Sequence, residues 1–177
     1  MRTFLPFLTL LPIALLPAAC KNNQKAAGAA APSPATEQVG VTTLGGPTAA
    51  DSLVFMLQRT HCFGRCPVYK IEVFRSGHAT YDGVLNVERL GQHRGRVSLD
   101  VLNELVQRAD SIGFSQMPDA YDADVTDLPS SIVRVVANGY DKQVKARVGT
   151  PQRLRLFVEH AESLLLPLDW QPVEQDH

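Results

Sequence analysis

The sequence lacks an excess of either charge and most of the short motifs that reveal chemistry. Its 17 lysines and arginines are balanced by 18 aspartates and glutamates, which leaves a net charge of −1. A basic surface for nucleic acid is therefore not expected. There is no Gly-rich phosphate loop, no dinucleotide fingerprint and no Gly-x-Ser-x-Gly nucleophile elbow. The sequence thus offers no recognisable catalytic constellation and implies no cofactor, and it favours a protein that is not an enzyme.

An apolar run long enough for a membrane span is also missing. The apolar stretch Phe4–Leu16 is interrupted by Pro6 and Pro12 and is too short to cross a bilayer as a helix. It follows the positively charged Arg2, an order that is typical of a signal peptide. We therefore expect residues 1–20 to direct export.

The end of this segment, Leu16-Pro17-Ala18-Ala19-Cys20, is similar to the lipobox of bacterial lipoproteins, although Pro17 departs from the leucine that is usual there. The resemblance implies that Cys20 is acylated, becomes the mature N-terminus and holds the protein on the membrane of the cell envelope. Lys21 resembles a signal for sorting to the outer membrane, on its periplasmic face. The alternative is an ordinary secretory signal cut near Ala18-Ala19.

The rest of the chain divides by composition into a tether, one domain and a short tail. Residues 21–51 are rich in Ala, Pro and Gly and have too few bulky apolar side chains to offset the entropy of ordering. We expect a disordered tether there. Residues 52–172 are enough for one domain with a single core. Residues 173–177 are expected to form a flexible tail.

Alternating polar and apolar residues predict strands in two groups. A turn at Gly77 joins two strands of the first group, and Asn138-Gly139 is a strong hairpin signal in the second. Gly91–Gly95, after the first group, are predicted to form a polar connection. The predicted strands are Leu53–Leu57, Val68–Phe74, Ala79–Val84, Ile132–Ala137 and Lys142–Val148.

Two helices are predicted from apolar stripes and their boundary residues. Ser98 is a suitable N-cap for the first, and Gly113 ends it. Thr150 caps the second, with Pro151 at its first position and Pro167 at its end. The order of elements predicts an α+β fold: a two-layer sandwich with a mainly antiparallel sheet of two hairpin units and both amphipathic helices on one face.

The stretch between the first two predicted strands carries a pair of cysteines. Cys62 and Cys66 are separated by three residues, and in an oxidising compartment such a pair is expected to form a structural disulfide. The closed ring would hold Phe63 and Arg65 on a rigid loop. Aromatic residues and arginine dominate binding hot spots, so this loop is a candidate binding surface.

Two other interpretations of the cysteine pair remain open. The Cys-x-x-x-Cys-Pro pattern is similar to that of copper-handling thioredoxin-like proteins, with His61, His78 or His93 as a third ligand. A strand follows the motif here, however, where that fold has a helix. A thiol-redox role is the other interpretation, although the spacing is not Cys-x-x-Cys. We predict no metal site.

Phe114–Ser130 has no clear period and is expected to be an irregular segment, the kind of loop that often carries function; the stretch 119–127 within it contains four aspartates. It fails the EF-hand pattern, and a solvated polar loop is favoured over a calcium site. We place Asp124 and Asp127 on the candidate binding surface, together with Tyr69. The expected partner is an envelope protein or another envelope component.

The run Arg59-Thr60-x-Cys62-Phe63-Gly64-x-Cys66-Pro67-x-Tyr69, followed by Tyr81-x-Gly83, resembles an uncharacterised bacterial family. The resemblance extends to Phe114, Tyr121 and Thr126-Asp127-x-Pro129. Members of this family look like small exported or lipid-anchored proteins with one domain of unknown function. The resemblance implies membership but supplies no mechanism and no catalytic residue.

Overall fold

The computed structural model describes residues 51–124 and 127–174. The predicted signal peptide, Cys20 and nearly all of the predicted tether lie outside the described residues, and so does most of the predicted tail. The following concerns the described part of the domain alone.

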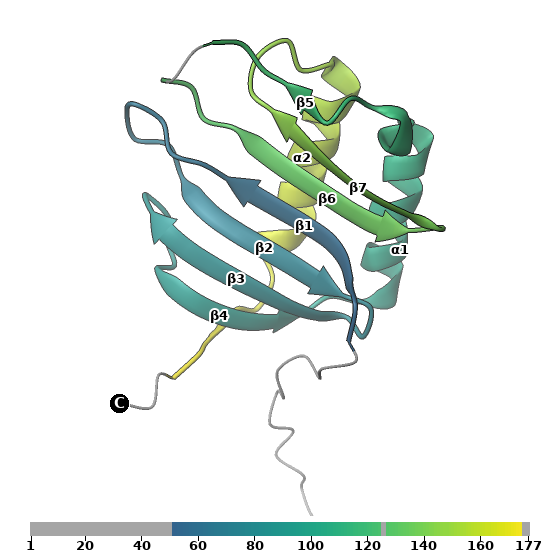
Figure 1. Cartoon of the computed structure of the whole chain (residues 1–177). Helices are drawn as coiled ribbons and strands as arrows, with labels where there is room; N and C mark the ends of the chain where they lie inside the picture. Colours follow the sequence, from purple (N-terminus) through teal and green to yellow (C-terminus); the bar gives the residue numbers. More distant parts are fainter. Residues whose placement is uncertain (1–50, 125–126, 175–177) are drawn as a thin grey trace, which may run out of the picture. The chain divides into compact units, whose positions relative to one another are not determined.

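The described residues form a sheet of short strands, two α-helices and one 3-10 turn (Figure 1). The strands are β1 (Leu53–Arg59), β2 (Val68–Phe74), β3 (His78–Leu85), β4 (Gly91–Arg96), β5 (Ala120–Tyr121), β6 (Ser131–Ala137), β7 (Tyr140–Ala146) and β8 (Gln171–Pro172). The helices are α1 (Leu99–Ser111), η1 (Phe114–Gln116) and α2 (Gln152–Leu165).

The eight strands make one sheet in the order β5-β7-β6-β1-β2-β3-β4-β8. Strand β1 is central, because it pairs with β2 on one side and with β6 on the other, both antiparallel. Only the short β5 runs parallel to its neighbour, β7. The predicted α+β class with a mainly antiparallel sheet is therefore confirmed.

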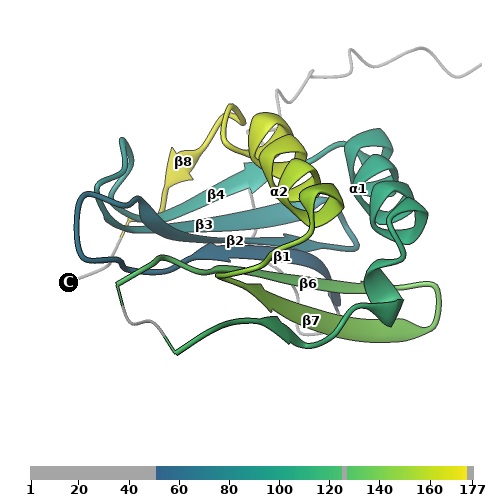
Figure 2. The same ribbon diagram turned by 90° about the horizontal axis from the view of Figure 1, so that it is seen from above.

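One face of the sheet forms the core with the helices, which lie together on one side of the sheet in Figure 2. Alternation in β2 sends Tyr69, Ile71 and Val73 to this face, and all three are buried. Helix α2 contributes Phe157, whose ring packs edge-on against Phe55 of β1 at a centroid distance of 6.0 Å. This packing fixes α2 across the middle of the sheet.

Local boundary residues behave as predicted at three points and differently at a fourth. The Ser98 hydroxyl caps α1 by accepting from the Val101 N–H at 3.2 Å, and Gly113 follows the helix with φ of 67°. Asn138 and Gly139 both have positive φ, the geometry that a tight hairpin turn requires. The prediction for α2 is wrong by one residue, since Pro151 occupies the N-cap position without a side-chain cap.

The predicted polar connection at Gly91–Gly95 is instead part of the sheet. It forms β4, which pairs with β3 from Gly83↔Gly91 to His78↔Arg96. The glycines hide the alternation, yet one of them is needed for packing: a Cβ on Gly95 would lie 3.0 Å from the Trp170 ring. Trp170 is buried there, and its indole N–H donates to the Leu165 carbonyl at 3.1 Å.

Candidate functional site

The loop between β1 and β2 is closed by its two cysteines. The Sγ atoms of Cys62 and Cys66 are 1.88 Å apart, which is disulfide distance, as the sequence predicts. Inside the ring, the Gly64 N–H donates to the Cys62 carbonyl at 3.0 Å. The side chains between the two cysteines are therefore presented by a constrained backbone.

The same loop is fastened to its neighbours. The Thr60 N–H donates to the Ser130 carbonyl at 3.0 Å, and the Ser130 N–H donates to the Thr60 hydroxyl at 2.8 Å. The Phe63 N–H donates to the Asp127 carbonyl at 3.2 Å, which joins the cysteine loop to the end of the Asp-rich segment. The structure thus brings together two predicted elements that are 64 residues apart in sequence (63 to 127).

The residues predicted for the binding surface do not all lie on it. Phe63 has 91% of its surface exposed, and Arg65 and Asp124 are exposed as well. Asp127 is exposed and adjoins Phe63 through its backbone. Tyr69 is only 3% exposed, because the alternation of β2 turns it toward the core. The placement of Tyr69 on the outer surface of the loop is therefore corrected.

Exposed apolar side chains gather around the cysteine loop. Of the seven large apolar residues that are well exposed among residues 51–124 and 127–174, five lie at this end of the sheet. Phe63 and Leu90 lie in the β1–β2 and β3–β4 connections, Leu128 precedes β6, and Val84 and Leu85 end β3. Figure 1 shows these segments at the same end of the sheet. We call this group the loop-end surface: Phe63, Val84, Leu85, Leu90 and Leu128. Single exposed apolar residues are ordinary, so what distinguishes this group is that its five members share one end of the sheet.

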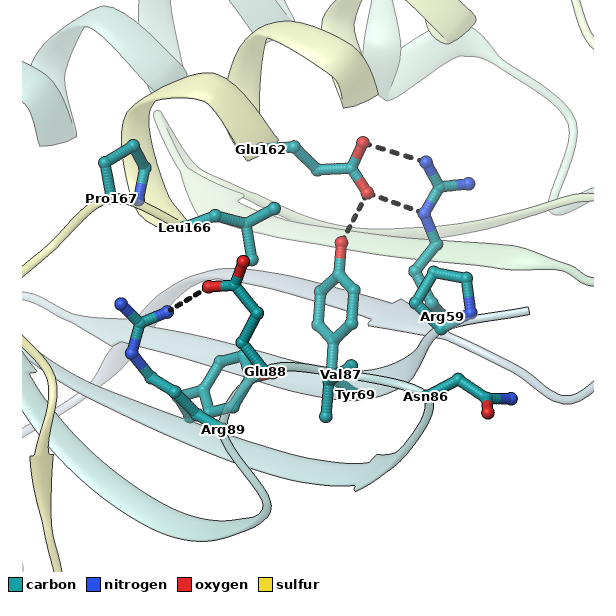
Figure 3. Close-up of a pocket in the computed structure, with 11 residues that line it drawn as sticks. Arg59, Tyr69, Asn86, Val87, Glu88, Arg89, Glu162, Leu166 and Pro167 are labelled. Atoms are coloured by element: carbon teal, nitrogen blue, oxygen red, sulfur yellow. Dashed lines mark hydrogen bonds and ion pairs between the residues drawn. The ribbon is translucent and has the colours of Figure 1, made fainter. Parts of the chain in front are cut away.

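A pocket of about 560 Å³ opens beside the loop-end surface. Pro67, the residue after the cysteine ring, forms one wall, and the Asn86 side chain ties the turn after β3 to the ring by donating to the Cys66 carbonyl at 3.1 Å. The remaining walls come from β1, β2, β3, the β3–β4 turn and the end of α2: Arg59, Tyr69, Tyr81, Asn86, Val87, Glu88, Arg89, Glu162, Leu166 and Pro167 (Figure 3).

A charged network closes the inner side of the pocket (Figure 3). The Arg59 guanidinium donates from Nε to Oε1 of Glu162 at 2.7 Å and from Nη2 to Oε2 at 2.9 Å. Its Nη1 donates to the Ser131 hydroxyl at 2.6 Å. The Tyr69 hydroxyl donates to the same Glu162 carboxylate. Three strands and α2 are thus joined by one two-pronged ion pair and two hydroxyl hydrogen bonds, the strong kind of polar contact.

The environment stabilises the ionised arginine and the neutral tyrosine. Burial lowers the pKa of Arg59, but its hydrogen bonds and ion pair with Glu162 outweigh burial and the pKa stands above its ordinary value. Burial, followed by the hydrogen bond to Glu162, raises the pKa of Tyr69 well above 10.0. At neutral pH the network therefore holds a cation and a neutral hydroxyl donor on one carboxylate.

Aromatic rings form the wall between the network and β8. The Tyr69 and Tyr81 rings stack with centroids 5.7 Å apart at 20°, and Tyr81 packs against Trp170 at 5.5 Å. Burial raises the pKa of the Tyr81 hydroxyl. A second charged pair, Glu88 with Arg89 at 3.8 Å, belongs to the β3–β4 turn on another side of the pocket (Figure 3). The pocket therefore has aromatic and apolar walls, with the charged network on its inner side and a second charged pair at its border.

The sequence profile of a domain of unknown function, DUF6438, matches residues 53–165 of the chain. The chain belongs to the DUF6438 family. The matched segment of the DUF6438 domain contains the cysteine ring and the three members of the charged network, Arg59, Tyr69 and Glu162. No curated protein matches the chain. The family supplies a membership but assigns no activity to the pocket.

The described part of the DUF6438 domain gives no support to a metal site. Within residues 51–124 and 127–174, no three His, Cys, Asp or Glu side chains are grouped so that they could hold a metal ion. Of the aspartates suggested as calcium ligands, Asp119 pairs with Lys142 and Asp122 with Lys145, both on β7. None of the described helices combines the length and apolarity needed to cross a membrane.

Glu162 is the residue that sequence reasoning missed. It lies in α2 at the border of the apolar stripe, three residues before the buried Leu165 and four after the buried Val158. A carboxylate at that position is a detectable signal, because a charge beside the buried stripe needs a partner. The partners, Arg59 and Tyr69, are 103 and 93 residues away in sequence, and only the fold brings them to it.

Proposed function

We propose that this protein is a lipoprotein of the bacterial cell envelope whose DUF6438 domain binds a partner protein through the loop-end surface. In this proposal Cys20 carries the lipid, and residues 21–51 hold a two-layer α+β sandwich away from the membrane. The domain acts as an interaction module. The Cys62–Cys66 ring supports binding by holding Phe63 in place.

The observation that carries the proposal is the exposure of Phe63 on a fastened loop. An aromatic side chain with 91% of its surface exposed contributes little to folding. The loop beneath it is held by the cysteine ring and by the Phe63–Asp127 hydrogen bond at 3.2 Å. A side chain held in advance loses less entropy on binding, so such an arrangement favours association.

The surroundings of Phe63 provide both parts of a binding interface. Leu128, Val84 and Leu85 offer further apolar area at the same end of the sheet. Arg65 adds a cation at the border. Interfaces combine a central aromatic or apolar anchor with a polar rim, and arginine is enriched among their strongest contacts.

The first experiment compares recovery of envelope partners by tagged variants expressed in the native host. Phe63→Ala with Arg65→Ala should keep the fold, since both side chains are exposed, and should lose the partner. The matched control removes an exposed apolar residue and an exposed arginine from α2, Leu156→Ala with Arg153→Ala, and should retain it. Equal recovery by both double variants would contradict the proposal.

The anchoring part is tested separately. Cys20→Ser removes the acceptor of the lipid and should move the protein from the membrane fraction to the soluble fraction of the envelope. The intact mass of the wild-type protein should show acyl chains on an N-terminal cysteine. A wild-type protein that lacks acyl chains would refute the anchor and leave the binding proposal to its own test.

A further inference from the structure

Phe63 projects from the cysteine ring, and the pocket opens beside the same ring. Pro67 follows the ring directly and lines the pocket. The Asn86 side chain, also in the pocket wall, donates to the Cys66 carbonyl at 3.1 Å. The separation between the projecting ring and the cavity is therefore fixed by covalent geometry and by a hydrogen bond.

The cavity suits an aromatic side chain better than a small polar ligand. Its inner wall carries the stacked Tyr69 and Tyr81 rings, and Val87, Leu166 and Pro167 add apolar surface. The charged groups at its inner side are already used, because Glu162 accepts from both Arg59 and Tyr69. A volume of about 560 Å³ leaves ample room for one benzyl group.

The border of the cavity carries the Glu88–Arg89 pair, and its more exposed member, Glu88, is opposite in charge to Arg65 of the cysteine loop. Arg65 lies two residues after Phe63 and is exposed. Glu88 lines the pocket with 92% of its side chain exposed, and its ion pair with Arg89 is long, at 3.8 Å. When the cysteine loop enters such a pocket, the Arg65 guanidinium comes close to the Glu88 carboxylate.

We infer that the partner of the loop-end surface is a second copy of this chain, with Phe63 of each copy inserted into the pocket of the other and Arg65 facing Glu88. The inference rests on the proposed function, since it names the partner of the same surface. In the inferred assembly the two insertions are related by a two-fold axis, and such a reciprocal contact closes as a dimer, whereas a head-to-tail contact would give an open chain.

The test is the sedimentation of the purified mature chain, made from Lys21 onward without the predicted signal peptide and the acylated Cys20, so that no lipid or detergent interferes. The chain with an unchanged loop-end surface should sediment as a reversible dimer. Phe63→Ala should make the chain monomeric, and the control Leu99→Ala, which removes an apolar residue 61% exposed at the start of α1, should leave the dimer intact.

Charge reversal decides whether the contact is the one inferred. Arg65→Glu and Glu88→Arg should each weaken the dimer roughly tenfold or more, because like charges then face each other twice. An equimolar mixture of the two variants should dimerise again, since each loop in the mixed dimer meets a rim of opposite charge. The double variant Arg65→Glu with Glu88→Arg should also recover the dimer.

Two results would overturn the inference: a monomer at high micromolar concentration, or a dimer that neither Phe63→Ala nor charge reversal affects. The proposed function fails independently. If the pure chain is monomeric but Phe63→Ala with Arg65→Ala still loses an envelope partner, only the second-copy inference is wrong. If these substitutions change neither sedimentation nor partner recovery, both are wrong.

Discussion

Replacement of Glu162 by alanine should destabilise the domain far more than replacement of Glu159, the other carboxylate of α2, which is exposed. The substitution deprives Arg59 of two hydrogen bonds, at 2.7 and 2.9 Å, and the buried Tyr69 hydroxyl of its acceptor. Arg59 keeps its contact with Ser131, at 2.6 Å. A partly buried cation and a buried hydroxyl are then left undersatisfied.

The size of the expected loss in stability depends on how deeply the Arg59–Glu162 ion pair is buried. The side chains of Arg59 and Glu162 are 27% and 19% exposed, between a surface pair and a fully buried one. Exposed pairs contribute about 0–1 kcal/mol and breaking a buried pair costs about 3–5 kcal/mol. With about 1 kcal/mol for the orphaned tyrosine hydroxyl, we expect a loss of roughly 2–3 kcal/mol. The midpoint of thermal unfolding should fall by about 10 °C.

The assay is urea unfolding followed by the fluorescence of Trp170, the single tryptophan, which is buried. Glu159→Ala, on the exposed side of the same helix, is the matched control and should change the free energy of unfolding by less than about 0.5 kcal/mol. The double variant Arg59→Met with Glu162→Leu should be less destabilised than Glu162→Ala, because no charge is left unpaired. If Glu162→Ala and Glu159→Ala unfold alike, the charged network contributes nothing to stability and the reasoning is refuted.

Two further predictions concern the ring and alkaline pH. Cys62→Ser with Cys66→Ser should lower the free energy of unfolding by roughly 2 kcal/mol, which is the loop-closure entropy expected for so short a loop. The same double substitution should speed hydrogen exchange at the Phe63 N–H. Unchanged exchange would show that the hydrogen bond to Asp127 alone fixes the loop. Burial raises the pKa of Tyr69 in the folded state above its unfolded value of 10.0, so the unfolded chain releases this proton first and stability falls as pH rises past 10.0. Urea titrations below and above pH 10.0 should show that the free energy of unfolding falls less with pH in Tyr69→Phe than in the wild-type protein. An identical fall in both proteins would exclude Tyr69 as a cause.

Most of the local structure is predictable because its causes are local. The Ser98 cap, the Asn138-Gly139 turn and the alternation of β2 each depend on residues a few positions apart. Strand β4 is different, since its sequence, Gly-Gln-His-Arg-Gly-Arg, has no apolar alternation. It becomes a strand because β3 offers it a pairing edge and Gly95 admits the Trp170 ring. Tertiary pairing there overrides weak propensity.

The candidate site divides in the same way. The cysteine ring and the exposure of Phe63 follow from a short motif, and their position was predictable. The pocket was not, because its walls come from β1, β2, the β3–β4 turn and the end of α2. Tyr69 illustrates the difference: its place in the motif suggests the surface, but its parity in β2 sends it inward to Glu162.

The charged network holds the base of the β1–β2 loop, and the cysteine ring holds its tip. Arg59 is the last residue of β1 and Tyr69 the second of β2, and the two are directly paired across the strands. Helix α2 holds both through Glu162, so the base of the loop is fixed from below. The ring fixes its tip, because Cys62 and Cys66 enclose only Phe63, Gly64 and Arg65. Loss of Glu162 should therefore disturb where the tip stands relative to the pocket, whereas loss of the ring should disturb only how Phe63 points. A dimer that depends on both the position and the direction of Phe63 would be weakened by loss of Glu162 and by loss of the cysteine ring. A surface that binds through scattered apolar contacts would tolerate both losses.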